Sequence, residues 1–180
     1  NVIGTRQQPA EVNRILELAA RYHFPNQPRQ TAAVQTEILR GLGEGLKRSG
    51  KSLLLYATAE NTDAARLIRT QISQAKKTAA DRRENSARRL GSIDLLSCTD
   101  LAAAQTALLP LLDARETQEL QSAVVVALTS FADPRVADLL LEKYPSLTPA
   151  IRREIVDRLL RRQDWILQLF SALENRTVSL

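Results

Sequence analysis

The fold is indicated most clearly by the stretch Thr117-QELQSAVVVALTSFADPRVADLLLEK-Tyr144. Apolar residues recur in it at helical spacing on both sides of the dipeptide Asp133-Pro134, and proline is favoured at the first position of a helix. The stretch therefore predicts two amphipathic helices, over about 117–131 and 134–144, that are joined by a short turn. Such a hairpin has an apolar face that it cannot cover alone.

The same spacing extends in both directions along the chain. It predicts further helices over about 9–22, 30–47, 62–80, 85–96, 100–112, 148–162 and 164–173. Pro25 and Pro28 are expected to end the first of them, and Asn61 or Thr62 to cap the helix over 62–80. In Ser52–Ala57 a short strand competes with a helix, and a short helix or turn is favoured.

The second half of the chain repeats with a period of just over thirty residues. Placing Asp100 on Asp133, and then Asp133 on Asp164, puts apolar residues on apolar residues. Sliding one amphipathic helix along another can give such a match, but the coincident aspartates, each expected to cap a helix, favour a true repeat. The matched pairs are Ile93 with Val126, Leu95 with Leu128, Cys98 with Phe131, Ala104 with Ala137, Leu108 with Leu141, Val125 with Val156, Leu128 with Leu159 and Val136 with Leu167.

A repeat of this length is typical of stacked helical hairpins. The sequence predicts an all-α, right-handed α-α superhelix, a HEAT/armadillo-like solenoid, as one domain over residues 1–180. The hairpins are expected to be regular over about 85–180 and irregular over 1–60, where Gly41, Gly43 and Gly45 weaken or kink a helix. Because the chain begins with Asn1 and contains no Met, we expect it to be an excised piece of a longer protein.

The composition excludes several kinds of site. The chain has one histidine, His23, and one cysteine, Cys98, so it can form neither an intrachain disulfide, a His-based metal cluster nor a Cys-x-x-Cys-His haem attachment. The apolar context of Cys98 favours an inert thiol over a Cys/His nucleophilic pair. The glycines at 41, 43 and 45 follow no strand and do not match a phosphate loop. We therefore predict no catalytic, cofactor-binding or metal-binding residue, and no membrane insertion, since no apolar run is long enough.

The chain carries 25 Lys and Arg against 20 Asp and Glu, a net charge of +5. Asp81 and Glu84 interrupt the densest group of cations, and no aromatic residues are interleaved for base stacking. A solvated face is favoured, and an anion-binding or nucleic-acid-binding groove is the alternative. The cations are Arg66, Arg69, Lys76, Lys77, Arg82, Arg83, Arg88 and Arg89. Trp165 is expected to pack between adjacent hairpins.

The last third of the chain resembles a known family. The resemblance rests on Phe131-ADPRVADLL-Leu141, on Tyr144-PSLTPAIR-Arg153, and on Asp164-Trp-Ile-Leu with the residues through Glu174 to Val178-Ser179. These motifs resemble the HEAT-like region of the large PVC-type haem-binding proteins of planctomycete-like bacteria, often labelled membrane-bound dehydrogenases. The resemblance is close over about 95–180 and general before that.

The resemblance implies an exported, periplasmic redox protein with several domains. In that family a β-propeller similar to sugar dehydrogenases precedes the helical region, and a cytochrome c domain with Cys-x-x-Cys-His follows it. Haem c is thus implied for the parent protein and not for these 180 residues. For this segment the resemblance implies a non-catalytic spacer and protein-interaction module, whose partners are neighbouring domains of the same chain. A nucleic-acid-binding repeat protein and a ligand-binding domain with a pocket between helices are the alternatives.

Overall fold

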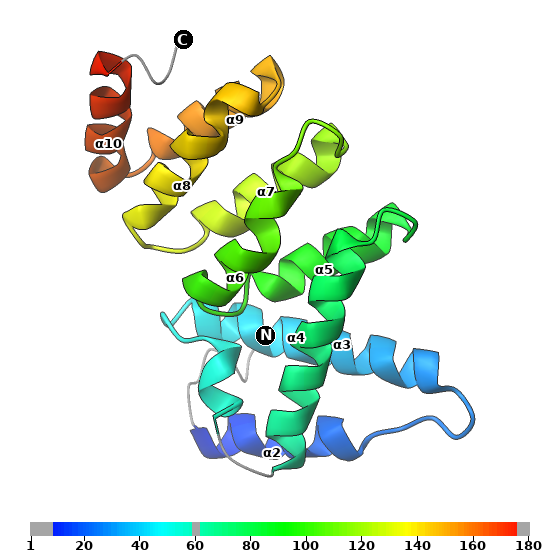
Figure 1. The fold of residues 1–180 in the computed structure, drawn as a ribbon. Helices are drawn as coiled ribbons and strands as arrows, with labels where there is room; N and C mark the ends of the chain where they lie inside the picture. Colours follow the sequence, from blue (N-terminus) through cyan, green and yellow to red (C-terminus); the bar gives the residue numbers. More distant parts are fainter. Residues whose placement is uncertain (1–8, 59–61, 176–180) are drawn as a thin grey trace. The chain divides into compact units, whose positions relative to one another are not determined.

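The computed structural model describes residues 9–58 and 62–175, and in these ranges the protein is helical, with no strand (Figure 1). The predicted all-α class is confirmed. The first half contains α2 (Pro9–Arg21), α3 (Pro28–Lys47), the 3₁₀ helix η1 (Leu53–Tyr56), α4 (Asp63–Ala80) and α5 (Ser86–Leu96). The second half contains α6 (Leu101–Leu108), η2 (Leu109–Leu111), α7 (Gln118–Thr129), α8 (Arg135–Lys143), η3 (Tyr144–Ser146), α9 (Pro149–Leu159) and α10 (Gln163–Glu174).

The helix boundaries follow from local sequence chemistry. Thr62, Asn85 and Thr117 each cap a helix, because their side-chain oxygens accept hydrogen bonds from backbone N–H groups of the first turn. The alternative cap Asn61 lies outside the described residues. The expectation that Pro28 ends the first helix is wrong, since Pro28 is the first residue of α3. Proline is well tolerated there because the N–H that it lacks would have no partner within the helix.

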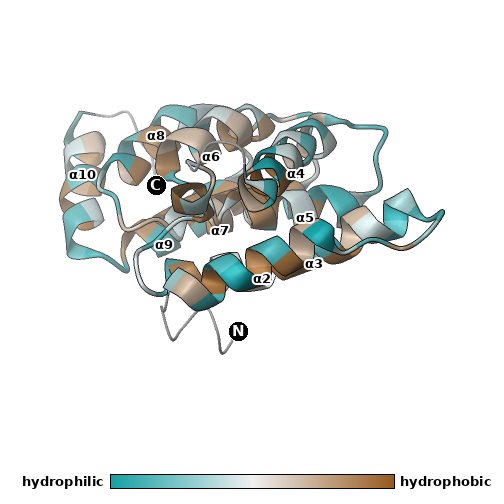
Figure 2. Cartoon of the chain, turned by 90° about the horizontal axis from the view of Figure 1, so that it is seen from below, coloured by the Kyte–Doolittle hydropathy of each residue, from teal (hydrophilic) through white to brown (hydrophobic). Residues whose placement is uncertain are grey.

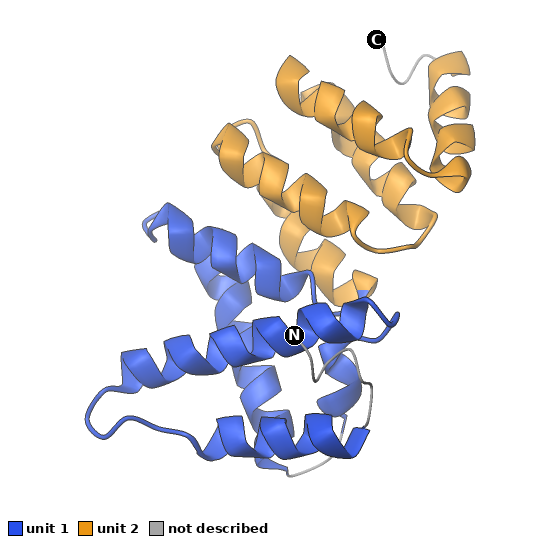
Figure 3. Ribbon diagram, turned by 180° about the vertical axis from the view of Figure 1, so that it is seen from behind, with its two compact units in different colours: residues 1–100 blue, residues 101–180 orange. Residues whose placement is uncertain are grey.

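The chain divides into two compact units, residues 1–100 and residues 101–180 (Figure 3). In unit 1, α2 contacts α3 and α4, while α5 contacts α4 and α3. In unit 2, α7 contacts α8 and α9, while α10 contacts α9 and α8. Contacts between helices that are two apart in the chain are typical of stacked hairpins. The single superhelix over residues 1–180 stays a prediction.

The predicted period appears in the helix starts. Helices α5, α7 and α9 begin at Ser86, Gln118 and Pro149, which are 32 and 31 residues apart. The pairing of Val136 with Leu167 is wrong, however, because Val136 is buried and Leu167 is 69% exposed. Helix α8 begins two residues after Asp133, whereas α10 begins one residue before Asp164. The two helices are therefore out of register, and matched residues lie on different faces.

Two further expectations of the repeat alignment are wrong. Asp164 does not cap α10, because it lies within the first turn and the residue before the helix is Arg162. Its negative charge still favours the amino-terminal end of the helix. The pair Ile93 and Val126 also differs, since Ile93 is buried and Val126 is 43% exposed. The period thus fixes the spacing of the hairpins and does not fix the face that each residue occupies.

Aliphatic side chains fill the core of each unit. Brown and teal residues alternate along α2, whose buried residues include Val12 and Leu16 (Figure 2). Polar groups also cross the core of unit 1: Thr36 Oγ1 donates to Gln71 Oε1 at 2.9 Å, and Gln71 Nε2 donates to Gln35 Oε1 at 3.3 Å. Gln35 Nε2 donates in turn to the backbone oxygen of Ala19 at 3.1 Å. This chain of hydrogen bonds connects α2, α3 and α4 and satisfies the nearly buried Gln71.

Helix α3 approaches the carboxyl end of α5 closely at Gly43. A Cβ atom at that position would lie 2.5 Å from Cβ and 2.8 Å from Sγ of Cys98. Polar contacts flank the approach, since Arg40 donates to Asp94 Oδ2 at 3.2 Å and Lys47 Nζ donates to Ser97 Oγ at 2.9 Å. The second glycine of the run therefore serves close packing, whereas the sequence suggested a flexible or kinked helix.

Candidate functional site

The basic residues of the predicted anion-binding region have different surroundings. Arg89 is buried, and its Nε donates to the carbonyl oxygen of Ala79 at 2.9 Å, which ties α5 to the end of α4. Arg69 donates to the carbonyl oxygen of Ala57 at 2.7 Å. Arg66 pairs with Asp63, and Arg88 pairs with Glu84 at 2.9 Å. Half of the predicted set is therefore occupied by contacts inside unit 1.

The other four cations are exposed, as are Arg66, Arg69 and Arg88 beside their partners. Lys76 and Lys77 lie near the end of α4, and Arg82 and Arg83 lie in the turn that follows. The carboxylate of Asp81 accepts a hydrogen bond from the backbone N–H of Arg83 at 2.9 Å, which places a negative charge within this group. Of the eight predicted cations only Arg89 is buried. Whether the other seven bind an anion together stays a prediction.

Cys98 is a buried residue of unit 1. Its side chain is 1% exposed, and its Sγ lies 3.7 Å from the carbonyl oxygen of Asp94. Burial raises the pKa of the Cys98 thiol to about 11, although the nearby Lys47 acts in the opposite direction. The thiol stays protonated at neutral pH and is a poor nucleophile. The structure gives Cys98 the inert environment that its sequence context predicts.

We expect Cys98 to react only when unit 1 opens. A disulfide exchange reagent should modify the native protein at least about a hundredfold more slowly than the protein in denaturant, because the buried thiol is both protonated and inaccessible. Absorbance of the released thiolate measures both rates. Equal rates in the two conditions would contradict the buried environment.

The same burial makes stability depend on pH. The pKa of a cysteine in an unfolded chain is about 8.5, and that of Cys98 in the folded protein is about 11. Between these two pH values the unfolded chain has lost its thiol proton while the folded protein keeps it, so unfolding becomes more favourable. The contribution of Cys98 to the free energy of unfolding is therefore fully present below about pH 8 and is lost as the pH rises toward the pKa of the folded protein. Burial lowers the pKa of Lys47, which changes stability in the opposite sense. The stability advantage over Cys98→Ala should fall by about 1 to 2 kcal/mol across this window, as measured by urea unfolding.

Other classes of site find no support in the part of the chain that the structure describes. His23 is exposed, with Nδ1 3.1 Å from the carbonyl oxygen of Arg21. Across residues 9–58 and 62–175, no three side chains of His, Cys, Asp or Glu are grouped to hold a metal ion. None of the helices described in these ranges has both the length and the apolar character needed to cross a membrane.

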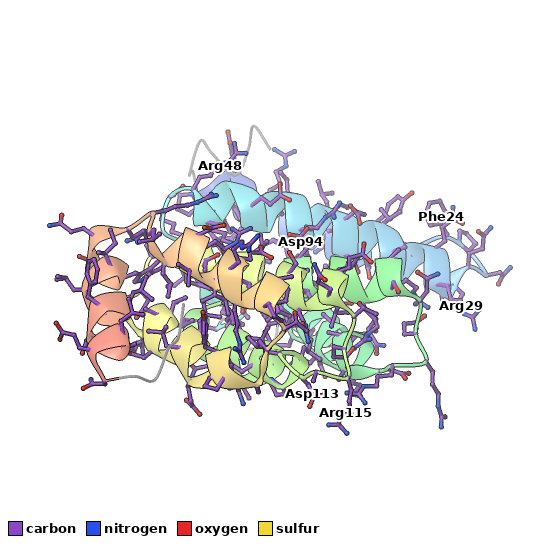
Figure 4. All side chains as sticks on the ribbon, turned by 90° about the horizontal axis from the view of Figure 1, so that it is seen from above. Phe24, Arg29, Arg48, Asp94, Asp113 and Arg115 are labelled. Carbon is purple, nitrogen blue, oxygen red and sulfur yellow. The ribbon has the colours of Figure 1, made fainter. Side chains whose placement is uncertain are left out.

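Two loops of unit 2 share an Asp-x-Arg clamp that the sequence analysis missed. Arg115 donates through Nε and Nη2 to the carboxylate of Asp113 at 2.8 and 3.0 Å (Figure 4). Arg135 does the same to Asp133 at 3.0 and 2.6 Å, and these hydrogen bonds hold the pKa of Asp133 below its usual range. In both clamps the backbone N–H of the arginine also donates to Oδ1 of the aspartate. The repeated spacing Asp-x-Arg was the available signal, and the clamps shape the loops before α7 and α8.

Helix α10 presents three different faces. Trp165 and Leu169 are buried, and Trp165 Nε1 donates to the carbonyl oxygen of Asp133 at 3.1 Å. Trp165 therefore packs α10 against the loop before α8, as predicted from the sequence. Leu167 and Phe170 lie on an outer face and are 69% and 56% exposed. The third face contributes to a groove.

This groove lies between α8 and α10 and has a volume of about 340 Å³. From α8 it is lined by Asp138, Leu141 and Glu142, and from α10 and its end by Gln168, Ser171, Ala172 and Asn175. Asp138 and Glu142 are four residues apart on one helix face, where two like charges destabilise a helix slightly. That unfavourable pair was a signal in the sequence, but nothing in the sequence placed α10 opposite it.

Comparisons with protein-family models, with curated proteins and with solved structures found no match. The resemblance to the PVC-type proteins therefore stays a prediction. What the structure itself offers are two surfaces of unit 2, the outer face of α10 and the α8–α10 groove, and the exposed cations of unit 1.

Proposed function

We propose that the chain is a non-catalytic helical-repeat scaffold that binds other protein domains, with the outer face of α10 as a binding surface. The exposure of Leu167 and Phe170 carries this proposal. In α8 and α9, which contact α10, no large apolar residue is exposed, and Leu140 and Ile155 are fully buried. A helix at the end of a stack needs a polar outer face to remain uncovered in water, and neighbouring exposed apolar residues commonly mark a protein-interaction site.

Unit 1 offers a similar surface on its first described helix. Leu18 of α2 is 62% exposed, and Tyr22, just beyond the helix, is 43% exposed. Tyr22 packs its ring edge-on against Phe24, with ring centroids 5.2 Å apart. One apolar surface in each unit suits a spacer with a neighbour on either side. In the redox protein that the resemblance implies, those neighbours are a β-propeller and a cytochrome c domain.

A photo-crosslinking amino acid at position 167, introduced into the protein in its natural host, tests the proposal. We expect the crosslinked peptide to belong to one defined protein domain and to disappear when Phe170→Glu is added, because a charge there opposes apolar docking. Mass spectrometry identifies the peptide. A crosslinker at Asp157, an exposed residue of α9, is the control.

The possible outcomes separate the parts of the proposal. A peptide from a β-propeller or cytochrome c domain of the same polypeptide supports the spacer role. A peptide from a separate protein supports the scaffold and removes the spacer. Heterogeneous products at 167 that match those at 157 and persist in the Phe170→Glu variant would contradict the binding surface itself.

Nucleic-acid binding is the second candidate, and the exposed Lys76, Lys77, Arg82 and Arg83 favour it. The net positive charge of the chain comes from unit 1: residues 1–100 hold 16 Lys and Arg and 10 Asp and Glu, whereas residues 101–180 hold 9 and 10. Four phosphate contacts would make the affinity fall steeply with salt. The absence of measurable DNA or RNA binding at low salt would remove this candidate.

A further inference from the structure

From the α8–α10 groove we infer a binding site for an arginine side chain of a partner protein. The inference rests on the proposed scaffold function and gives the partner a chemistry: an extended segment that carries arginine next to apolar residues. The groove is lined by two carboxylates and a leucine on the α8 side, and by two amides, a hydroxyl and an alanine on the α10 side.

The carboxylates of Asp138 and Glu142 are the charged groups of the groove. Both residues are exposed, and within the described residues neither forms an ion pair. The net charge of unit 2 is also slightly negative, in contrast to unit 1. Two unneutralised carboxylates one helical turn apart attract a cation, and a guanidinium group can donate to both of them.

The opposite side of the groove adds polar groups that can accept hydrogen bonds. Gln168 and Ser171 of α10 and Asn175, the residue after the helix, line this side of the groove. Among the described residues, the Oε1 atom of Gln168 is buried and has no hydrogen-bond partner. A buried acceptor without a donor is unfavourable, and the guanidinium group provides five N–H donors.

Apolar atoms complete the site. Leu141 and Ala172 are the apolar residues of the lining, and the part of them that faces the groove can contact the aliphatic part of an arginine side chain. Beyond Ser171, the surface of α10 continues to Leu167 and Phe170, where apolar neighbours of that arginine would contact the outer face. A volume of about 340 Å³ accommodates one side chain and not a folded domain.

The probe for this site is the peptide Ac-Ala-Leu-Arg-Leu-Ala-amide, compared with the same peptide carrying neutral citrulline in place of arginine. In proton–nitrogen correlation spectra of the whole chain, the arginine peptide should shift amide signals of α8 and α10. Its affinity should be about tenfold higher than that of the citrulline peptide. It should also fall several-fold between about 10 mM and 150 mM salt.

Matched double variants locate the binding. Asp138→Asn with Glu142→Gln should weaken the arginine peptide by about tenfold and leave the citrulline peptide unchanged. Glu119→Gln with Asp157→Asn makes the same change of charge on exposed positions of α7 and α9, outside the groove, and should have little effect. The double variant of α8 also removes a repulsive pair, so it is expected to fold.

Several results would overturn the inference: no shifts in α8 and α10, equal binding of the two peptides, or equal loss in both double variants. The proposed scaffold function is tested separately, by the crosslink at position 167. If the arginine peptide does not bind while that crosslink remains specific, the scaffold function stands and the arginine site is wrong. If the crosslink fails while the peptide binds as expected, the groove is a site and the outer face of α10 is not.

Discussion

Replacing Gly43 by alanine is expected to lower the free energy of unfolding by about 2 to 3 kcal/mol. In a helix interior, alanine is normally favoured over glycine by about 1 kcal/mol. Here the new methyl carbon would lie 2.5 Å from Cβ of Cys98, 2.8 Å from its Sγ and 3.0 Å from Cδ1 of Leu53. The Cβ of Cys98 is fixed to the backbone and cannot rotate away, so α3 must move from α5, and this strain exceeds the gain in helix propensity.

Gly91 provides the matched control. It is also a helical glycine of unit 1, but a Cβ built there meets no atom within 4 Å. Gly91→Ala should therefore stabilise the protein by about 0.5 to 1 kcal/mol, since only propensity changes. Urea unfolding followed by far-ultraviolet circular dichroism measures both variants. The same sign of effect for the two variants would show that α3 does not depend on the close approach at Gly43.

The contrast between these glycines shows what the sequence could predict. Helix ranges followed from periodicity and caps, which act within a few residues: Thr62, Asn85 and Thr117 were recognisable because the groups they satisfy are close in the chain. The role of Gly43 depends on Cys98, which is far along the sequence. Only the packing of α3 against the end of α5 brings Gly43 and Cys98 together. Helix propensity alone therefore predicted a weakened or kinked helix.

The candidate sites also differ in whether their residues are close together or far apart in the sequence. The cations between Arg66 and Arg89 are close in sequence and looked like one group, but Arg89 and Arg69 bind backbone carbonyl oxygens inside unit 1. The α8–α10 groove combines residues about thirty positions apart, and its two carboxylates alone have no distinctive motif. Helix α10 begins three residues earlier relative to its aspartate than α8 does, and Leu167 is exposed where Val136 is buried; no alignment of apolar residues detects this.

Replacing Trp165 by alanine is expected to have the largest effect in unit 2, a loss of about 3 to 5 kcal/mol in the free energy of unfolding. Trp165 is 2% exposed and is the only tryptophan of the chain. The substitution removes its buried ring, the hydrogen bond from Nε1 to Asp133 and the contact with the Arg162 guanidinium carbon, 4.9 Å from the ring centroid. Part of the effect is the cavity that the ring leaves, because the surrounding groups relax only partly into it.

Two further variants divide this effect into its parts. Trp165→Phe keeps most of the ring contacts and loses the Nε1 hydrogen bond, so a loss of about 1 to 2 kcal/mol is expected. Phe170→Ala removes a large aromatic group from the outer face of the same helix and should change stability by less than about 0.5 kcal/mol. Circular dichroism serves for all three, since Trp165→Ala removes the fluorescent side chain. Equal losses for Trp165→Ala and Phe170→Ala would mean that the inner and outer faces of α10 are assigned wrongly, and with them the exposed surface on which the proposed scaffold depends.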